Sequence, residues 1–118
     1  MTSAAVETVR VGDGGRIVVA RGELDLYAAP AFRADLLAAV ATGDVVVVDL
    51  LEVTFVDSTA LGTLVGAAKR LPEGTRLALA CRDRNVRRTL ELTGIDRLVP
   101  VFETVEAAFA GGGPVHGA

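Results

Sequence analysis

The chain has 118 residues, the usual length of a single domain with one hydrophobic core. Half of the residues are hydrophobic but only 4% are aromatic, so the core must be built from Val, Leu and Ala. The chain also has few aromatic side chains on which the bases of a nucleic acid could stack. The net charge is −3, whereas a nucleic-acid-binding protein usually has an excess of basic residues. One cysteine excludes an internal disulfide bond, and without a Cys/His cluster we expect no metal and no cofactor.

The N-terminal segment has no basic region followed by an apolar one. No apolar stretch approaches the roughly 18 residues of a membrane span. The sequence therefore predicts a soluble, cytoplasmic protein with no membrane and no nucleic acid among its partners.

The first predicted elements are two short strands within residues 6–24, joined by the turn sequence GDGG. Residues 27–43 (YAAPAFRADLLAAVATG) predict a helix with Pro30 in its first turn and Gly43 as its C-cap. One face of this helix is apolar and consists of Phe32, Leu36, Leu37 and Val40. Residues 44–50 (DVVVVDL) predict a strand that is buried on both faces, because polar residues do not alternate with apolar ones.

A second helix is predicted from Ser58 to Leu71, and the turn sequence LPEGT ends it. Its inner residues at helical spacing are Leu61, Leu64, Val65, Ala68 and Leu71. Residues 76–82 (RLALACR) predict another buried strand, in which Cys81 is a small buried hydrophobic residue. Residues 83–94 (DRNVRRTLELTG) predict a charged helix that buries Val86 and Leu90 and stops at Gly94.

Residues 97–102 (RLVPVF) predict a short final strand, and Pro100 favours a position at the sheet edge. A last helix follows in residues 104–110 (TVEAAFA), with Thr104 as its cap and Glu106 in its first turn. We expect one domain over residues 1–110 and a disordered, Gly-rich tail over residues 111–118. The alternation of strands and helices after the opening hairpin predicts an α/β fold, with a mixed sheet of about five strands and helices as crossovers.

The segment VDSTA places an acid and two hydroxyls where the most apolar strand passes into a helix. Asp57 or Ser58 can be the N-cap of this helix, and capping alone would explain the residue types. Because Asp57 suffices as a cap, the hydroxyls of Ser58 and Thr59 are not needed for capping, and one of them is a candidate for a chemical role. A helix N-terminus at the carboxyl end of a buried strand also attracts negative charge.

The same helix contains two glycines one turn apart, Gly62 and Gly66, each costing roughly 1 kcal/mol relative to Ala. Together with Thr63 they leave a nearly bare strip that runs from Ser58 along the helix. Such a strip allows another backbone to approach closely. The approaching backbone belongs either to a partner protein, which we favour, or to a neighbouring helix of the same domain.

A serine after a strand and before a helix also suggests the nucleophile of a hydrolase. That motif requires Gly two positions before and two positions after the serine. Here Asp57 and Thr59 flank Ser58, and the positions that need Gly hold Val56 and Ala60. The only histidine, His116, lies in the Gly-rich tail and has no fixed geometry with Ser58. No phosphate-binding glycine motif precedes a helix. We therefore expect a protein that is not an enzyme, and a small serine hydrolase is the alternative.

Three segments resemble the STAS domain of bacterial anti-sigma factor antagonists: GELD at 22–25, VVVVDLLEVTFVDSTALGTLVGA at 45–67 and ELTGIDRLVPVFETVEAA at 91–108. The most specific part is Asp-Ser-Thr-x-Leu-Gly after an apolar strand. The resemblance implies that an anti-sigma factor with serine-kinase activity phosphorylates Ser58, with Thr59 as the alternative acceptor. It further implies that the unphosphorylated chain binds this anti-sigma factor and so frees the sigma factor, and that a serine phosphatase acts on the phosphorylated form.

The resemblance also places Asp25, in the GELD segment, near Ser58. The expected partner-binding residues are Asp25, Asp57, Ser58, Thr59, Gly62, Thr63 and Gly66. The alternative function is that of a STAS subunit in another signalling or lipid-transport complex, without phosphorylation.

Two further features stand beside the resemblance. The family usually has Gly after the two hydroxyls, whereas this chain has Ala60, whose added methyl is expected to alter the approach of a kinase loop to Ser58. The second feature is a basic cluster of Arg82, Arg84, Arg87 and Arg88, which is interpreted as a solvated helix face balanced by Asp83 and Glu91. A secondary partner contact is the alternative for this cluster.

Overall fold

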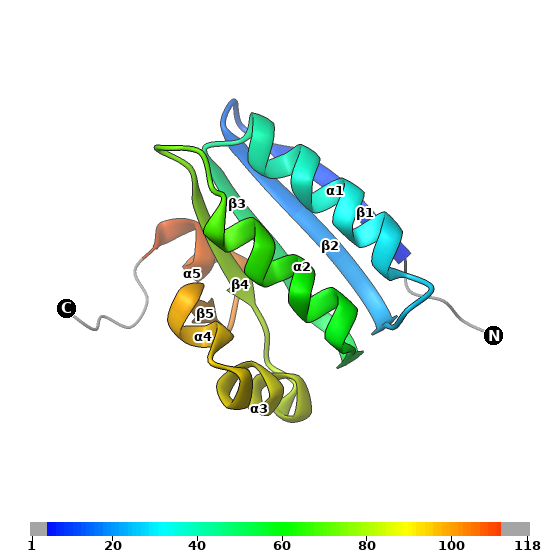
Figure 1. Cartoon of the computed structure of the whole chain (residues 1–118). Coiled ribbons are helices and arrows are strands. Elements are labelled where there is room, and N and C mark those ends of the chain that lie inside the picture. Colours follow the sequence, from blue (N-terminus) through cyan, green and yellow to red (C-terminus); the bar gives the residue numbers. More distant parts are fainter. Residues whose placement is uncertain (1–4, 112–118) are drawn as a thin grey trace.

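The computed structural model of the chain describes residues 5–111. Its strands form one five-stranded sheet in the order β1-β2-β3-β4-β5, in which β1 is antiparallel to β2 and all other neighbours are parallel (Figure 1). The elements in chain order are β1 (Ala5–Val11), β2 (Gly15–Leu24), α1 (Ala29–Thr42), β3 (Val45–Val56), α2 (Ser58–Lys69), β4 (Arg76–Ala80), α3 (Arg84–Thr93), α4 (Ile95–Leu98), β5 (Val101–Phe102) and α5 (Val105–Ala110). The predicted α/β fold with an opening hairpin and a mixed sheet is confirmed.

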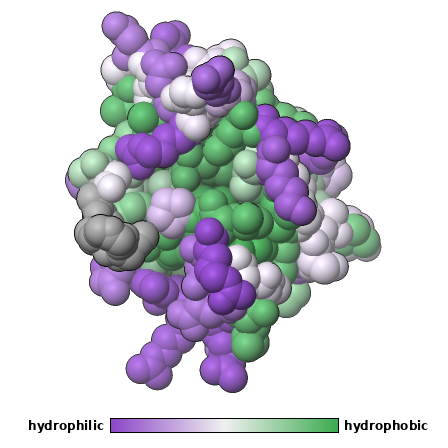
Figure 2. Space-filling model, turned by 60° about the vertical axis from the view of Figure 1, so that its left-hand side comes forward, coloured by the Kyte–Doolittle hydropathy of each residue, from purple (hydrophilic) through white to green (hydrophobic). Residues whose placement is uncertain are grey.

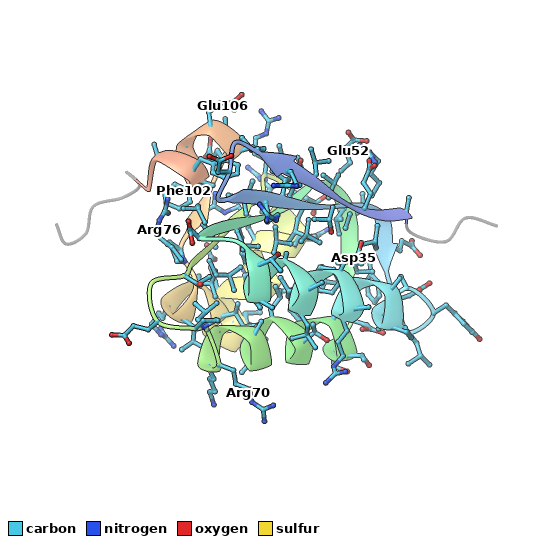
Figure 3. All side chains as sticks on the ribbon, turned by 90° about the horizontal axis from the view of Figure 1, so that it is seen from above. Asp35, Glu52, Arg70, Arg76, Phe102 and Glu106 are labelled. Carbon is cyan, nitrogen blue, oxygen red and sulfur yellow. The ribbon has the colours of Figure 1, made fainter. Side chains whose placement is uncertain are left out.

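The helices cover the two faces of the sheet unequally. Helices α1 and α2 lie on one face and α5 lies on the other (Figure 3). The larger core cluster contains residues of α1, α2, α3 and α4, together with alternate residues of β2, β3 and β4. The smaller cluster, under α5, consists of Val47, Ala78, Ala80, Phe102 and Ala108. The helices that follow β2, β3 and β4 thus share one face, whereas the helix that follows β5 crosses to the other.

Strand β3 is longer than the predicted strand over residues 44–50. In its first half it is buried on both faces as expected, because Val46 and Val48 face the larger cluster and Val47 faces the smaller one. It continues to Val56 because its second half pairs with β2 as far as Leu24. This pairing brings the ends of β2 and β3 to the same edge of the sheet.

Helix α1 begins at Ala29 rather than at Tyr27, and Gly43 follows its last residue as predicted. Its inner residues Phe32, Leu36 and Val40 are buried. Leu37 was expected on the same face, but its side chain is 38% exposed. Phe32, Leu36 and Val40 are four positions apart and meet the core, and a rotation of about 100° from Leu36 carries Leu37 to the margin of that face.

The predicted strand over residues 97–102 is wrong in its first half. Residues Ile95–Leu98 form the short helix α4, and β5 contains only Val101 and Phe102. Gly94 ends α3 with a φ of 78° and starts a new helical turn that buries Ile95. The edge position of β5 is confirmed, since among the described strands it pairs with β4 alone.

Helix α5 is fixed at both ends by side chains. The hydroxyl of Thr104 accepts a 3.0 Å hydrogen bond from the amide of Ala107, which confirms the predicted cap. At the other end the guanidinium of Arg76 donates to the carbonyl oxygens of Ala108 and Phe109 (Figure 3). Gly111 ends the helix with a φ of 65°, and the rest of the tail that is predicted to be disordered, residues 112–118, lies outside the described residues.

The surface and the helix lengths add two observations to this arrangement. Seen from the side of α4 and α5, the molecule has an apolar area in its middle with hydrophilic side chains around it (Figure 2). Within residues 5–111, no helix has the length and apolar character needed to cross a bilayer.

Candidate functional site

Asp57 is the N-cap of α2. Its backbone is extended, with φ −89° and ψ 177°, and its Oδ1 accepts hydrogen bonds from the amides of Thr59 (3.0 Å) and Ala60 (3.1 Å). Two of the free amides at the helix N-terminus are therefore satisfied by Asp57 alone. Of the two caps considered from the sequence, Asp57 has this role, and the hydroxyl of Ser58 is not needed for it.

Ser58 is the first residue of α2 and is exposed. Within residues 5–111, its hydroxyl forms no hydrogen bond with another protein group. The helix dipole makes this position favourable for negative charge. The structure thus presents a free primary hydroxyl at an N-terminus that can accommodate a negatively charged group.

Asp25 lies beside the start of α2, although 32 positions separate it from Asp57 in the numbering. Leu24 pairs with Val56 at the ends of β2 and β3, and the amide of Asp57 donates a 3.0 Å hydrogen bond to the carbonyl of Leu24. Oδ1 of Asp25 accepts from the amides of Tyr27 and Ala28, both at 3.0 Å. Asp25 and Asp57 therefore follow the paired residues at the carboxyl ends of β2 and β3, and each accepts two backbone amides. Two carboxylates thus lie beside Ser58 at this end of the sheet.

The two glycines of α2 face open space. A Cβ atom added to Gly62 or to Gly66 would have no heavy atom within 4 Å, apart from its own helix backbone and chain neighbours. The sequence left open whether these glycines pack against a helix of the same domain. The structure argues against that alternative, because no other element of the described chain comes within 4 Å of either Cβ position.

The strip is one wall of a groove between α1 and α2. Two depressions of about 340 Å³ and 360 Å³ share Arg33, Thr59 and Thr63. Their other lining residues are Leu26, Ala29, Pro30, Ala34, Leu37, Gly62, Gly66, Ala67 and Arg70. Arg70 projects away from the domain at the far end of α2 (Figure 3). The groove runs from the Ser58 end of α2 towards its C-terminus.

Sequence reasoning missed the α1 side of this groove. Leu26 and Tyr27 are 62% and 86% exposed in the loop between β2 and α1. Tyr27 was included in the predicted helix, yet it precedes α1. Two large apolar side chains directly after the GELD segment were the available signal, because large exposed hydrophobic side chains beside a groove indicate a contact surface.

Ala60 does not have the expected effect on access to Ser58. Its side chain is fully buried and belongs to the larger core cluster. The methyl group that replaces a hydrogen atom of the family's glycine therefore points into the domain. A protein that approaches Ser58 from solvent does not meet it.

Cys81 is fully buried, as predicted. Burial raises the pKa of its thiol, since the charged thiolate is poorly solvated there. Within residues 5–111, no three His, Cys, Asp or Glu side chains are grouped so as to hold a metal ion.

The fold agrees with the comparison to known families. The STAS domain model matches residues 5–108, nearly the whole chain. This protein therefore belongs to the STAS domain family.

Individual relatives narrow the comparison. The chain is 37% identical, over 68% of its length and 72% of the relative's, to an anti-sigma-B factor antagonist of Listeria monocytogenes. It is 29% identical, over 88% of each chain, to the anti-sigma-F factor antagonist RsfB of Mycobacterium tuberculosis. A crystal structure of an anti-sigma factor antagonist from Mycobacterium paratuberculosis superimposes with a TM-score of 0.85 at 30% identity, covering 92% of this chain and 93% of that one.

Proposed function

We propose that this protein is an anti-sigma factor antagonist whose partner is an anti-sigma factor with serine-kinase activity. The unphosphorylated chain binds that partner and frees a sigma factor, phosphorylation of Ser58 ends the binding, and a serine phosphatase restores it. The exchange takes place in the cytoplasm, and the chain is a binding partner and a kinase substrate rather than an enzyme. The named relatives support the anti-sigma factor as partner.

The observation that carries the switch is the state of Ser58. Its hydroxyl is exposed and has no hydrogen-bond partner among residues 5–111, because Asp57 caps α2. A kinase can therefore modify Ser58 without removing a hydrogen bond that holds the fold. A phosphate adds a charge of about −1.5 to −2 at a helix N-terminus, which accommodates an anion locally.

The same phosphate would be unfavourable at an interface. Asp25 and Asp57 already place two carboxylates at this edge of the sheet. A partner seated in the groove between α1 and α2 would have to bury the new charge next to them. Repulsion and desolvation then separate the two proteins while the fold of the chain stays the same.

The proposal is tested by the mass of the protein isolated from its own cells, followed by peptide mapping. We expect a fraction that carries one phosphate, on Ser58, because the hydroxyl of Thr59 is on a β-branched side chain and is more hindered. Titration of the two forms with the purified anti-sigma factor should show binding only for the unmodified form. A phosphate on Thr59 with Ser58 unmodified, or equal binding of both forms, would contradict the proposal.

A further inference from the structure

The basic cluster of α3 lies where the chain leaves the sheet in two opposite directions. The last paired residues of β4 and β5 are Ala80 and Phe102, and the amide of Cys81 donates a 2.9 Å hydrogen bond to the carbonyl of Phe102. Beyond this bond the chain after β4 enters α3 on one face of the sheet, and the chain after β5 enters α5 on the other. In open α/β sheets, a crevice at the carboxyl ends of such diverging strands is the usual place for a ligand.

A depression of about 600 Å³ occupies this position. Its lining residues are Arg82, Arg84, Asn85, Arg87, Arg88, Glu91 and Glu103, and we call this set the α3 basic surface. Residues 82–88 contain four arginines and one aspartate, a net charge of +3, in a chain whose total is −3. The rest of the chain therefore carries −6. Hydrophilic side chains gather over α3, at the lower end of the molecule (Figure 2).

The arginines of this surface have few partners in the protein. Arg87 lies 3.8 Å from Glu103, whereas Arg82, Arg84 and Arg88 form no ion pair with any other residue of the described chain. The carboxylate of Asp83 is engaged elsewhere, because its Oδ1 accepts from the amides of Asn85 (2.9 Å) and Val86 (3.1 Å). The two acids that were expected to balance this helix face, Asp83 and Glu91, form no ion pair with the arginines within the described chain.

Glu91 lies at favourable helical spacing from Arg87 and Arg88, but the position of Arg84 does not stabilise the helix. Arg84 is the first residue of α3, where the dipole disfavours a cation. Arg84 also lies three and four positions before Arg87 and Arg88, the spacing at which like charges repel along a helix. Three arginines without an ion pair in the described chain, Arg82, Arg84 and Arg88, point to an anionic ligand.

The lining residues decide what kind of anion fits. The set contains no aromatic side chain, so a nucleobase has nothing to stack on. Glu91 and Glu103 on the walls, with the acidic remainder of the chain, would repel a densely charged nucleic acid or membrane. Guanidinium groups that are separated along a helix can each form a bidentate pair with one of several carboxylates spaced along a peptide.

We propose that the α3 basic surface binds an acidic segment of a protein partner. The contact is formed by guanidinium groups and carboxylates across the crevice between α3 and the β5–α5 connection. It is separate from the groove between α1 and α2, and no step of it involves Ser58. The interaction goes beyond the proposed function, and it can be tested without the anti-sigma factor.

The test uses a short synthetic peptide in which Glu alternates with Ser, carrying a fluorescent label, and a second peptide with Gln in place of Glu. Fluorescence anisotropy at low ionic strength measures binding to the full chain, because salt screens exposed charge pairs. The test variant combines Arg84→Glu and Arg88→Glu. The control variant combines Arg10→Glu and Lys69→Glu, which changes the net charge equally at exposed positions outside the α3 basic surface.

We expect the parent to bind the Glu peptide and not the Gln peptide, with shifts of backbone amide signals confined to α3 and its surroundings. The test variant should bind at least about tenfold more weakly, and the control should stay within about twofold of the parent. Glutamate at the start of α3 suits the helix dipole, so the melting temperature of the test variant should not fall. If that variant nevertheless fails to fold, Arg82→Gln with Arg88→Gln replaces it, and Arg10→Gln with Lys69→Gln is then the control of equal net charge.

Three results would overturn the proposal. The first is an equal loss of binding in the test and control variants, which would mean that only net charge matters. The second is no binding of the Glu peptide by the parent. The third is tighter binding of pyrophosphate, single-stranded DNA or anionic lipid vesicles than of the peptide at this surface, which would assign it to a different ligand class.

Discussion

The amide of Asp57 donates a 3.0 Å hydrogen bond to the carbonyl of Leu24, and this bond joins two loops that carry the candidate site. One loop leads from β2 through Asp25 into α1, and the other leads from β3 through Asp57 into α2. Both loops are anchored by an aspartate that accepts two backbone amides. The position of Ser58 relative to the groove is therefore set by backbone contacts and by caps, not by its own side chain.

Charge at Ser58 should change binding but not stability. Ser58→Asp is expected to abolish binding of the anti-sigma factor and to leave the melting temperature nearly unchanged, because a helix N-terminus favours a carboxylate. Ser58→Ala should bind constitutively and lose little stability, since the hydroxyl makes no hydrogen bond within the described chain. Binding titrations and thermal melts of both variants check this. Equal binding by Ser58→Asp and the parent would show that charge at this residue is not the switch.

The cap at Asp57 should contribute to stability on its own. Asp57→Ala leaves the amides of Thr59 and Ala60 without their acceptor, and we expect a loss of about 0.5–2 kcal/mol in the free energy of unfolding. Asp57→Asn keeps an oxygen acceptor of similar capping strength and should lose much less. Urea unfolding of the two variants measures the difference. An equal loss in both would assign the effect to the charge rather than to the cap.

The glycines of α2 should report where the partner lies. Gly66→Ala is expected to stabilise the fold by a few tenths to 1 kcal/mol, because the new methyl group meets no other atoms and raises helix propensity. Gly66→Leu should leave the fold intact and weaken binding strongly, since its side chain would fill the groove between α1 and α2. Thermal melting and a binding titration measure the two effects.

Gly74→Ala is the matched control for Gly66→Ala. Gly74 too has open space around it, but its φ is 90°, a conformation that disfavours any side chain. Gly74→Ala should therefore destabilise the fold by about 1–2 kcal/mol and leave binding unchanged. A large drop in stability for Gly66→Leu, with normal binding by the protein that remains folded, would refute the groove as the interface.

Cys81 should make stability depend on alkaline pH. Its pKa is raised in the folded state by burial, so the unfolded chain releases the proton first as the pH rises. The stabilising effect is complete below the ordinary thiol pKa of about 8.5 and is lost as the pH rises from there through the folded-state value. Urea unfolding at several pH values should show this loss in the parent and a smaller one in Cys81→Ala.

Thiol reactivity provides an independent measurement on the same residue. A buried thiol with a raised pKa should react slowly with a disulfide reagent in the native protein and rapidly in denaturant. Rapid reaction under native conditions would contradict the burial of Cys81.

Local signals account for what could be predicted from the sequence. The apolar run Val45–Val48, the aspartate before α2 and Gly94 after α3 each act on their immediate neighbours, and each has the predicted structure. Even the bare strip of Gly62 and Gly66 was visible, because helical spacing alone places these residues on one side of α2. The helix that replaces the first half of the predicted final strand is the main local error, since a short apolar run of this kind suits either structure.

The tertiary structure decided everything that depends on residues far apart in the chain. The pairing of Leu24 with Val56 sets Asp25 beside Asp57, and no local pattern encodes that register. The groove needs α1 packed next to α2, and the burial of Ala60 depends on which face of α2 meets the core. The crossing of α5 to the opposite face creates the crevice beside the arginines of α3. Propensity acts between neighbours in sequence, whereas sites arise between neighbours in space, and only packing of the whole sheet brings those together.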